Sequence, residues 1–477
     1  MKLSELAREL PQVELFGDAQ VRGLCTDSRV AGEGDLFFCF RGTRADAHTF
    51  ASEAVGRGAA AIVCEQKLPL VCAQLVVRDG REAMARLAAA FFGHPERAMK
   101  MIGVTGTNGK TTTAAMTANI LNEAEIPAGV IGTLGAAYAN VRVPPSLTTP
   151  DPVCLFSLLR DMKNAGMRAV VMEVSAHALA LKKEAPIFYD VAVFTNLTRD
   201  HLDFFGDMRR YADAKRGLFA PDRCAFAVLN ADDAFSKELA GENAAHIFYG
   251  LETPADAFAV IESDALRGCK AVLNLQDELC EATIGLTGRH NLSNALAAAC
   301  AARRLGAGTT AIVRGLGKTR VDGRLEWVAN VHGGDVFVDF AHTPDGLEKS
   351  LTALREHCTG RLIVLFGCGG NRDAGKRGKM GEIAARCADA AVITSDNPRY
   401  EDPYAIISAI EAGFRSVSAE YVAIEEREKA IRYALGQLSE GDVLLIAGKG
   451  GEKYQEIMGI KYDYDDKDVI RNLVGKS

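Results

Sequence analysis

The sequence predicts an α/β fold of three domains: a central P-loop ATPase-like parallel sheet, a C-terminal Rossmann-like domain and a smaller N-terminal α/β domain. Three observations carry this prediction. The chain of 477 residues is too long for one ordinary hydrophobic core. Its apolar runs alternate with helical segments, as in parallel sheets that are covered by helices. A glycine-rich turn that ends in Lys-Thr, at residues 106–112, follows an apolar strand pattern.

The three domains are expected at residues 1–97, 98–320 and 321–477. In the first, short strands alternate with alanine-rich helical segments at 50–60 and 82–92. The second opens with the strand before the glycine-rich turn, and the third repeats the alternation of strands and helices.

Five near-continuous apolar runs predict buried parallel strands in the second and third domains. These runs are 169–172, 191–194, 362–366, 390–393 and 443–446. A polar cluster follows each run, at 173–175, 195–196, 367–372, 396–399 and 448–450. Because ligands of such folds bind beyond the carboxyl ends of the strands, these clusters are the candidate sites.

Composition narrows the class of protein. A net charge of −7 argues against a general nucleic-acid or membrane-surface binder, and no apolar run reaches the ~20 residues of a membrane span. The N-terminus is charged and amphipathic, unlike a signal peptide. Twelve cysteines without a C-x-x-C pair indicate reduced, mostly buried thiols. We therefore expect a cytoplasmic enzyme with neither a nucleic-acid nor a membrane partner.

The glycine-rich turn predicts a nucleotide site. A strand, a glycine-rich turn, Lys-Thr and a helix together wrap backbone N–H groups around phosphates. Lys110 would reach the terminal phosphates, and the hydroxyl of Thr111 would hold Mg²⁺. The general P-loop pattern requires glycine at position 104, where Val104 stands, so this is a variant loop for ATP or GTP.

A dinucleotide site is not predicted. The run Gly367-Cys368-Gly369-Gly370 would need a glycine at position 372 to complete the dinucleotide fingerprint, and Arg372 stands there.

Phosphoryl transfer also requires hard ligands for divalent cations. Glu173, at a strand end, is a candidate carboxylate ligand, and the segment 195–203 offers His201 and two further acids. Taken alone, His201 is more typical of a loop or helix cap, and Lys215 of a solvated helix lysine.

Together these motifs resemble the Mur ligase family, the ATP-dependent amide-bond-forming enzymes of peptidoglycan synthesis, over essentially the whole chain. The resemblance rests on GTNGKTT (106–112), Thr148-Thr149-Pro150, Glu173-Val174-Ser175, TNLTRDHLD (195–203), DFAHTPD (339–345), GCGGNRDAGKR (367–377) and DNPR (396–399). Within the family, the chain is similar to members that add the third residue of the stem peptide to UDP-MurNAc-L-Ala-D-Glu.

The resemblance implies the site residues. Lys110, Glu173, His201 and Lys215 would be catalytic, and Thr111, Glu173, His201 and a Lys215 carbamylated by CO₂ would bind two Mg²⁺. ATP would contact Gly106, Thr107, Asn108, Gly109, Lys110, Thr111, Thr112, Asn291, Arg324 and Asp339. The UDP precursor would contact Thr26, Ser28, Thr43, Arg44, Ala45, Thr148, Thr149, Ser175 and Lys183. His342 and Asp345 are nearby candidates for the base that deprotonates the incoming amine.

The amino acid implied by DNPR is meso-diaminopimelate, because an arginine can fork onto its distal carboxylate. Its contacts would be Arg372, Asp396, Asn397, Pro398, Arg399, Gly448 and Glu452, with Glu452 suited to the distal ammonium. Family members commonly carry Gln and Arg where this chain has Leu181 and Lys183. All implied partners are small molecules, and a monomer is expected.

Two alternatives stay open at this stage. One is a sibling ligase that adds lysine to the same precursor or glutamates to folate. The other is a P-loop NTPase switch, which would turn over nucleotide without any small-molecule acceptor.

Overall fold

The structure is a computed structural model that describes residues 1–42, 45–242, 245–417 and 420–475. The chain divides into two compact units. Unit 1 comprises Met1–Gly103, Ile126–Ala192 and Ala214–Phe226, and unit 2 comprises Val104–Glu125, Val193–Asp213 and Ala227–Ser477. Strands β6 (Lys100–Thr105) and β11 (Val191–Phe194) and helix α8 (Met208–Arg216) pass from one unit into the other. The domain boundaries expected near residues 97 and 320 stay predictions.

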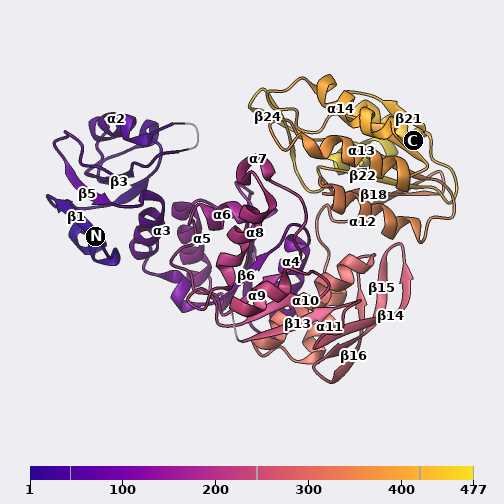
Figure 1. Cartoon of the computed structure of the whole chain (residues 1–477), viewed down its shortest axis with the longest axis horizontal. Coiled ribbons are helices and arrows are strands. Elements are labelled where there is room, and N and C mark those ends of the chain that lie inside the picture. Colours follow the sequence, from indigo (N-terminus) through magenta and orange to yellow (C-terminus); the bar gives the residue numbers. More distant parts are fainter. Residues whose placement is uncertain (43–44, 243–244, 418–419, 476–477) are drawn as a thin grey trace. The chain divides into compact units, whose positions relative to one another are not determined.

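The N-terminal part of unit 1 is a five-stranded sheet with helices on both faces (Figure 1). Its strands are β1 (Val13–Phe16), β2 (Gly23–Cys25), β3 (Asp35–Phe38), β4 (Ala61–Cys64) and β5 (Ala73–Val77). Its α-helices are α1 (Leu3–Leu6), α2 (Ala51–Gly56) and α3 (Gly80–Phe91). The strand order is β1-β5-β4-β3-β2, and only β1 runs antiparallel to its neighbour.

Alternate residues of these strands face opposite layers, as a period of two requires. Leu36 and Phe38 pack with Leu87 of α3, whereas Phe37 packs with Ala54 of α2. The carboxylate of Asp79 caps α3 by accepting hydrogen bonds from the first backbone N–H groups of the helix.

The remainder of unit 1 carries strands β7 (Ala128–Gly132), β8 (Gly135–Tyr138), β9 (Val141–Val143) and β10 (Ala169–Glu173), and helices α5 (Pro152–Asn164) and α6 (Ala176–Ala180). Strand β10 pairs in parallel with β7, whereas β7, β8 and β9 form an antiparallel meander. The predicted strand at 169–172 is confirmed, and every residue of β10 is buried.

The central part of unit 2 surrounds helix α4 (Lys110–Glu123). Its strands are β12 (Ala227–Asn230), β13 (His246–Gly250), β14 (Ala257–Ala265), β15 (Gly268–Leu275) and β16 (Glu278–Ile284). Its other helices are α7 (Leu202–Phe205), α9 (Ser236–Glu242), α10 (Arg289–Arg304) and α11 (Thr309–Lys318). Helix α11 lies so close to α4 that a Cβ at Gly315 would come within 2.5 Å of the backbone of Ile120.

The sheet here is mixed, which the prediction of parallel sheets did not include. Strands β12, β13 and β14 pair in parallel, but β14, β15 and β16 pair antiparallel. The burial of β15 alternates along the strand, as expected where one face of an antiparallel sheet is open to water.

The C-terminal part of unit 2 is a three-layer α/β/α arrangement (Figure 1, orange to yellow). Its strands are β17 (Glu326–Val331), β18 (Gly334–Asp339), β19 (Leu362–Phe366), β20 (Ala390–Ile393), β21 (Glu420–Ala423) and β22 (Val443–Ala447). Its helices are α12 (Pro344–Arg355), α13 (Gly375–Cys387), α14 (Pro403–Arg415), α15 (Arg427–Gly436) and α16 (Asp466–Val474), and a separate hairpin consists of β23 (Tyr454–Ile457) and β24 (Ile460–Asp463).

The order of this sheet is β17-β18-β22-β19-β20-β21, with only β17 antiparallel to its neighbour. Helices α12, α13 and α14 pack on one face through residues such as Leu347, and α15 and α16 on the other through residues such as Ile431. The predicted strands at 362–366, 390–393 and 443–446 are confirmed. Their carboxyl ends therefore meet at one edge of the sheet. Within the described ranges, no helix is both long and apolar enough to cross a membrane.

Candidate active site

The glycine-rich loop connects β6 to α4 in unit 2 and depends on two of its glycines. Gly106 and Gly109 have φ angles of 146° and 84°, in the region that favours glycine. A Cβ at Gly106 would overlap the side chain of Thr195, and a Cβ at Gly109 would overlap that of Asn294. The loop is thus packed tightly between the end of β11 and helix α10.

Asn196 holds the backbone of this loop. Its carbonyl accepts from the N–H of Thr107 at 2.8 Å, and its Oδ1 accepts from the N–H of Asn108 at 2.9 Å. The Nζ of Lys110 donates to the carbonyls of Gly106 and Thr107, at 2.9 and 2.8 Å. Because the first N–H groups of a helix have no partner within it, those at the start of α4 are suited to phosphate oxygens.

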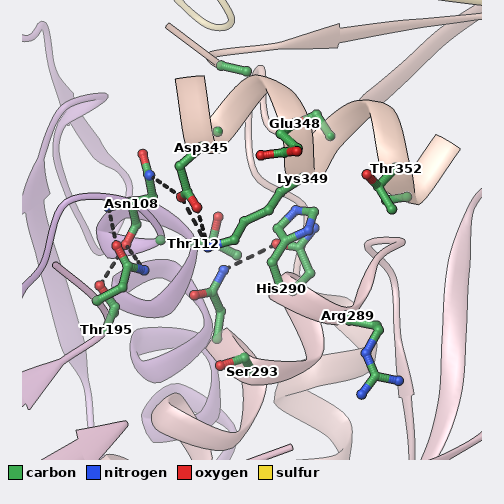
Figure 2. A pocket seen from close by; sticks show the side chains of 18 of the residues that line it. Asn108, Thr112, Thr195, Arg289, His290, Ser293, Asp345, Glu348, Lys349 and Thr352 are labelled. Carbon is green, nitrogen blue, oxygen red and sulfur yellow. Dashed lines mark hydrogen bonds and ion pairs between the residues drawn. The ribbon is translucent and has the colours of Figure 1, made fainter. Parts of the chain in front are cut away.

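A cavity of about 510 Å³ opens beside the loop within unit 2 (Figure 2). Of the residues expected to contact ATP, it is lined by Asn108, Gly109, Thr112, Asn291, Arg324 and Asp339. The others, at 106, 107, 110 and 111, lie in the adjoining loop and the first turn of α4. The structure thus places all the expected ATP contacts in or next to one cavity.

The buried side chains of this cavity are held in place by hydrogen bonds. Asn291 donates to the carbonyl of Thr287 at 2.8 Å. Asp339 accepts from the backbone N–H groups of Leu325 and Ala341, at 2.7 and 3.0 Å, and burial raises its pKa. The guanidinium of Arg324 donates to the hydroxyl of Thr111 at 2.8 Å.

Helix α12 contributes further charged side chains to the cavity. The carboxylate of Asp345 accepts from the side-chain amide of Asn108 at 2.7 Å and from the Nζ of Lys349 at 3.0 Å (Figure 2). Asp345 was expected only as a candidate base, and neither Lys349 nor Asn294 was predicted. Lys349 could have been found from the sequence, because it lies one helical turn after Asp345.

Asp200 is a buried acid beside two histidines and a lysine of unit 2. Its carboxylate lies 3.4 Å from Nε2 of His201, 3.9 Å from Nε2 of His342 and 3.9 Å from Nζ of Lys376. Burial opposes its ionisation, but these three neighbours together hold the pKa of Asp200 at about 2. The sequence had indicated His201 and the two acids of the segment 195–203 as candidate ligands, but not the contact between Asp200 and Lys376, which lies far along the chain.

Two of the four expected metal ligands, Glu173 and Lys215, belong to unit 1. Glu173, at the end of β10, is buried, and its carboxylate accepts from the backbone N–H and hydroxyl of Thr133, at 2.8 and 3.1 Å. Lys215, on α8, has only 1% of its surface exposed, unlike the solvated helix lysine that its surroundings in the sequence suggested. Thr111 and His201 lie in unit 2. The assignment of all four to one metal site stays a prediction.

Four residues expected to contact the UDP precursor belong to unit 1, and three of them, Thr148, Thr149 and Ser175, lie near Glu173. The hydroxyl of Thr149 donates to the Glu173 carbonyl at 2.8 Å and accepts from the Ser175 N–H at 3.0 Å. The hydroxyl of Thr148 lies 3.1 Å from that of Thr133, and Lys183 is paired with Asp151 at 2.8 Å.

Three other expected precursor contacts, Thr26, Ser28 and Ala45, lie outside the strands of the N-terminal sheet. Thr26 and Ala45 are exposed, whereas Ser28 is buried and donates to Glu53 at 2.8 Å. The side chain of Asp27 caps the short 3₁₀ helix Ser28–Val30. Thr43 and Arg44 lie outside the described residues.

The residues expected to contact the diamino acid gather at the carboxyl edge of the C-terminal sheet. Asn397 donates to Glu452 at 2.9 Å and accepts from the Nζ of Lys449 at 3.0 Å. Lys449, which was not predicted, is fully buried and lies 3.3 Å from Glu452. Burial and the neighbouring Asp396 raise the pKa of Glu452, while Lys449 opposes this shift.

Arginine side chains lie beside this cluster. A Cβ at Gly369 would be 2.9 Å from Nη1 of Arg399 and 3.8 Å from Cγ of Arg372, so the two arginines flank the same glycine. Gly448, with a φ of 110°, brings its backbone against the carboxylate of Asp396. The carbonyl of Pro398 packs against Gly370. The cluster therefore offers cationic and anionic groups to a ligand that carries both charges.

Comparison with known proteins gives the same assignment along the whole chain. Family models described as the Mur ligase family catalytic domain, the Mur ligase middle domain and the Mur ligase glutamate ligase domain match residues 20–92, 104–302 and 323–450. A curated UDP-N-acetylmuramoyl-L-alanyl-D-glutamate--2,6-diaminopimelate ligase of Geobacillus kaustophilus is 42% identical over 99% of both chains. Its namesake from Geobacter metallireducens is 41% identical over 98% of both chains.

A solved structure with the same enzyme name superposes with a TM-score of 0.67 at 31% identity, covering 96% of this chain and 95% of its own. Together with the α/β sheets described above, these matches confirm the predicted fold class.

Proposed function

Because this chain belongs to the Mur ligase family, we propose that it is an ATP-dependent ligase of peptidoglycan precursor synthesis. It adds meso-diaminopimelate to the γ-carboxylate of D-Glu in UDP-MurNAc-L-Ala-D-Glu. One observation carries the proposal: unit 2 combines the glycine-rich loop and its cavity with a mixed-charge cluster that holds Asn397, Arg399 and Glu452. Relatives that match over nearly their full length bear the name of this enzyme.

The reaction begins with transfer of the γ-phosphoryl group of ATP to the γ-carboxylate of D-Glu, which gives an acyl phosphate. The N–H groups at the start of α4 and the Nζ of Lys110 bind the phosphates, and the hydrogen bonds of Asn196 keep the loop in shape. The amine of the diamino acid then attacks the acyl carbon, and phosphate leaves. Catalysis of such steps depends mainly on positioning and on stabilisation of charge.

Two Mg²⁺ ions fit the donor set of this chain. Thr111, Glu173, His201 and a carbamylated Lys215 would hold them and so neutralise the triphosphate during transfer. The buried carboxylate of Glu173 supports this fit, because carboxylate oxygens are hard donors of the kind that Mg²⁺ prefers. Lys215 is buried, and carbamylation by CO₂ would turn its side chain into an anion suited to a cation.

The diamino acid binds through both kinds of charge in the C-terminal cluster. Arg372 and Arg399 receive carboxylates, and Glu452, held by Asn397 and Lys449, receives the distal ammonium. Thr148, Thr149, Ser175 and Lys183 contact the muramyl dipeptide, while the loops at residues 26–28 and 43–45 contact its UDP end. The enzyme acts as a cytoplasmic monomer.

The test is phosphate release with ATP, Mg²⁺ and UDP-MurNAc-L-Ala-D-Glu, with meso-diaminopimelate, lysine and ornithine offered in separate reactions. We expect turnover with meso-diaminopimelate. Turnover with lysine alone would identify the lysine-adding sibling instead, and phosphate release without any amine would identify an NTPase switch. Omission of the UDP precursor is the control, because a ligase then releases no phosphate above background.

A further inference from the structure

The residue that faces Arg399 is a carboxylate of the chain itself. The Nε of Arg399 donates to Oε2 of Glu456 at 3.1 Å, and its Nη1 donates to the carbonyl of Gly370 at 2.8 Å. Both side chains of this ion pair are mostly buried, with 16% and 21% of their surfaces exposed. Nη2 makes no hydrogen bond with any residue that the structure describes. Arg399 therefore already holds one carboxylate on one edge of its guanidinium.

The backbone keeps Glu456 in this position. Arg399 has a φ of 54°, and its N–H donates to the carbonyl of Glu456 at 3.0 Å. The carbonyl of Arg399 accepts from the N–H of Met458 at 2.7 Å, and Arg399 thereby forms an isolated parallel β-bridge with Ile457 of β23. The N–H of Glu456 donates to Oδ1 of Asn397 at 2.9 Å. The carboxylate of Glu456 is consequently built into the DNPR loop rather than free to swing far from it.

We propose that Glu456 is a specificity-determining residue that competes with the distal carboxylate of the diamino acid for Arg399. This inference rests on the proposed function, in which Arg399 receives that carboxylate. A second carboxylate at the same guanidinium must either bind end-on at Nη2 or displace Glu456. In both cases Glu456 occupies and partly neutralises the guanidinium of Arg399, and so weakens the binding of a distal carboxylate to that guanidinium.

Glu456 has the opposite effect on a diamino acid that lacks the distal carboxylate. Lysine would leave Arg399 without a substrate partner, and a desolvated, unpaired guanidinium is costly. Glu456 supplies that missing partner. Glu456 therefore lowers the ratio of kcat/KM for meso-diaminopimelate over that for lysine, because specificity is a difference between two affinities.

The experiment compares Glu456→Gln with the wild-type enzyme in steady-state assays with meso-diaminopimelate and with lysine. Gln keeps the size of the side chain but removes its charge. We expect the KM for meso-diaminopimelate to fall by about 3- to 10-fold, as is typical when one like charge is removed near a binding site. The ratio of kcat/KM for meso-diaminopimelate over lysine should rise, while kcat and the KM for ATP stay within about 2-fold. Glu411→Gln, which breaks a helix ion pair with Arg415 elsewhere in the same domain, is the matched control.

A double-mutant cycle tests whether the effect passes through Arg399. In an Arg399→Ala background, Glu456→Gln should leave the KM for meso-diaminopimelate unchanged. A rise in the KM for meso-diaminopimelate in Glu456→Gln would overturn the inference. An equal fall in that KM when Glu456→Gln is made in the Arg399→Ala background would also overturn it. Glu456 would then only support the hairpin. If the wild-type enzyme does not accept meso-diaminopimelate, the proposed function is wrong. If the wild-type enzyme accepts it but Glu456→Gln does not change its KM, only the inference about Glu456 is wrong.

Discussion

At the scale of single residues, Arg427 and Asp466 form an ion pair whose side chains are both fully buried. Nε and Nη2 of Arg427 donate to the two carboxylate oxygens at 2.8 and 2.7 Å, and Nη2 also donates to the carbonyl of Ala447. The pair joins α15, α16 and the end of β22. Each charge offsets the cost of burying the other, because either charge alone would destabilise the folded state in this interior.

Asp466→Ala should therefore destabilise the C-terminal part of unit 2 by about 3–5 kcal/mol, because it leaves the guanidinium of Arg427 buried without a counter-ion. Urea titration followed by the fluorescence of Trp327, the single tryptophan of the chain, reads this part because Trp327 lies in β17. Glu428→Ala, which removes the exposed partner of Arg432, is the control and should cost about 0–1 kcal/mol. Equal losses in both variants would contradict the argument.

Burial and the nearby Lys349 lower the pKa of His290, in the nucleotide cavity, to about 4. In the unfolded chain its pKa returns to about 6.5. Below pH 6.5 the unfolded state binds a proton that the folded state does not, so stability falls as the pH drops from 6.5 to 4. Above pH 6.5 the contribution of this group is fully present.

We expect the free energy of unfolding of His290→Asn to fall less steeply with decreasing pH than that of the wild type, by up to about 1 kcal/mol per pH unit. Chemical denaturation between pH 4.5 and 7 measures this slope. His332→Asn, at an exposed turn, serves as the comparison. A wild-type slope that survives unchanged in His290→Asn would show that the imidazole does not titrate in this way.

The proposed carbamate on Lys215 makes activity depend on dissolved CO₂. Wild-type enzyme in CO₂-depleted buffer should lose phosphate release and regain it when bicarbonate is added. Lys215→Arg should lose at least about 100-fold in kcat, because a guanidinium carries the wrong charge for a metal ligand, and bicarbonate should not restore it. Full wild-type activity after thorough depletion, with bound CO₂ absent by mass spectrometry, would exclude the carbamate.

At the scale of elements, the glycine-rich loop and the β23–β24 hairpin differ in how far the sequence revealed them. The loop consists of seven consecutive residues. Its binding of nucleotide phosphates could be predicted because this binding depends on local backbone shape. The hairpin was not predicted. The residues of β24 are exposed, and those of β23 are partly buried except for the exposed Ile457, so the segment lacks the buried apolar run that is typical of the central strands.

The loop gives a sharp test through two glycines with similar backbone angles. Gly109 and Gly166 have φ of 84° and 81°, but a Cβ at Gly166 would meet nothing within 4 Å. Alanine at either position should cost about 1–2 kcal/mol for the left-handed backbone. Only Gly109→Ala, whose Cβ would overlap Asn294, should also weaken binding of a fluorescent ATP analogue, by at least about 10-fold. Similar losses of affinity in both variants would mean that backbone strain alone controls the loop.

At the scale of the whole molecule, the fold class and the five buried strands were predictable because apolar periodicity is a local property of the chain. The contacts that complete the site were less accessible. Asn108 and Asp345 are 237 positions apart, and Asp200 and Lys376 are 176 positions apart. No pattern in a single sequence encodes such pairings. The partners that were missed, including Lys349, Lys376 and Glu456, are charged residues that would otherwise be interpreted as solvated surface.

The interleaving of the two compact units has a consequence for synthesis on the ribosome. The chain leaves unit 1 after Gly103, returns at Ile126, and contributes its last segment to unit 1 only at Ala214–Phe226. Unit 1 is therefore incomplete until nearly half of the protein has been made, even though its first sheet can form early. Domains generally fold as units as they emerge from the ribosome. Strands β7 and β10 are therefore synthesised, together with helix α4 of unit 2, before the last segment of unit 1 is available. Pauses in translation beyond residue 226, rather than before it, would favour productive folding.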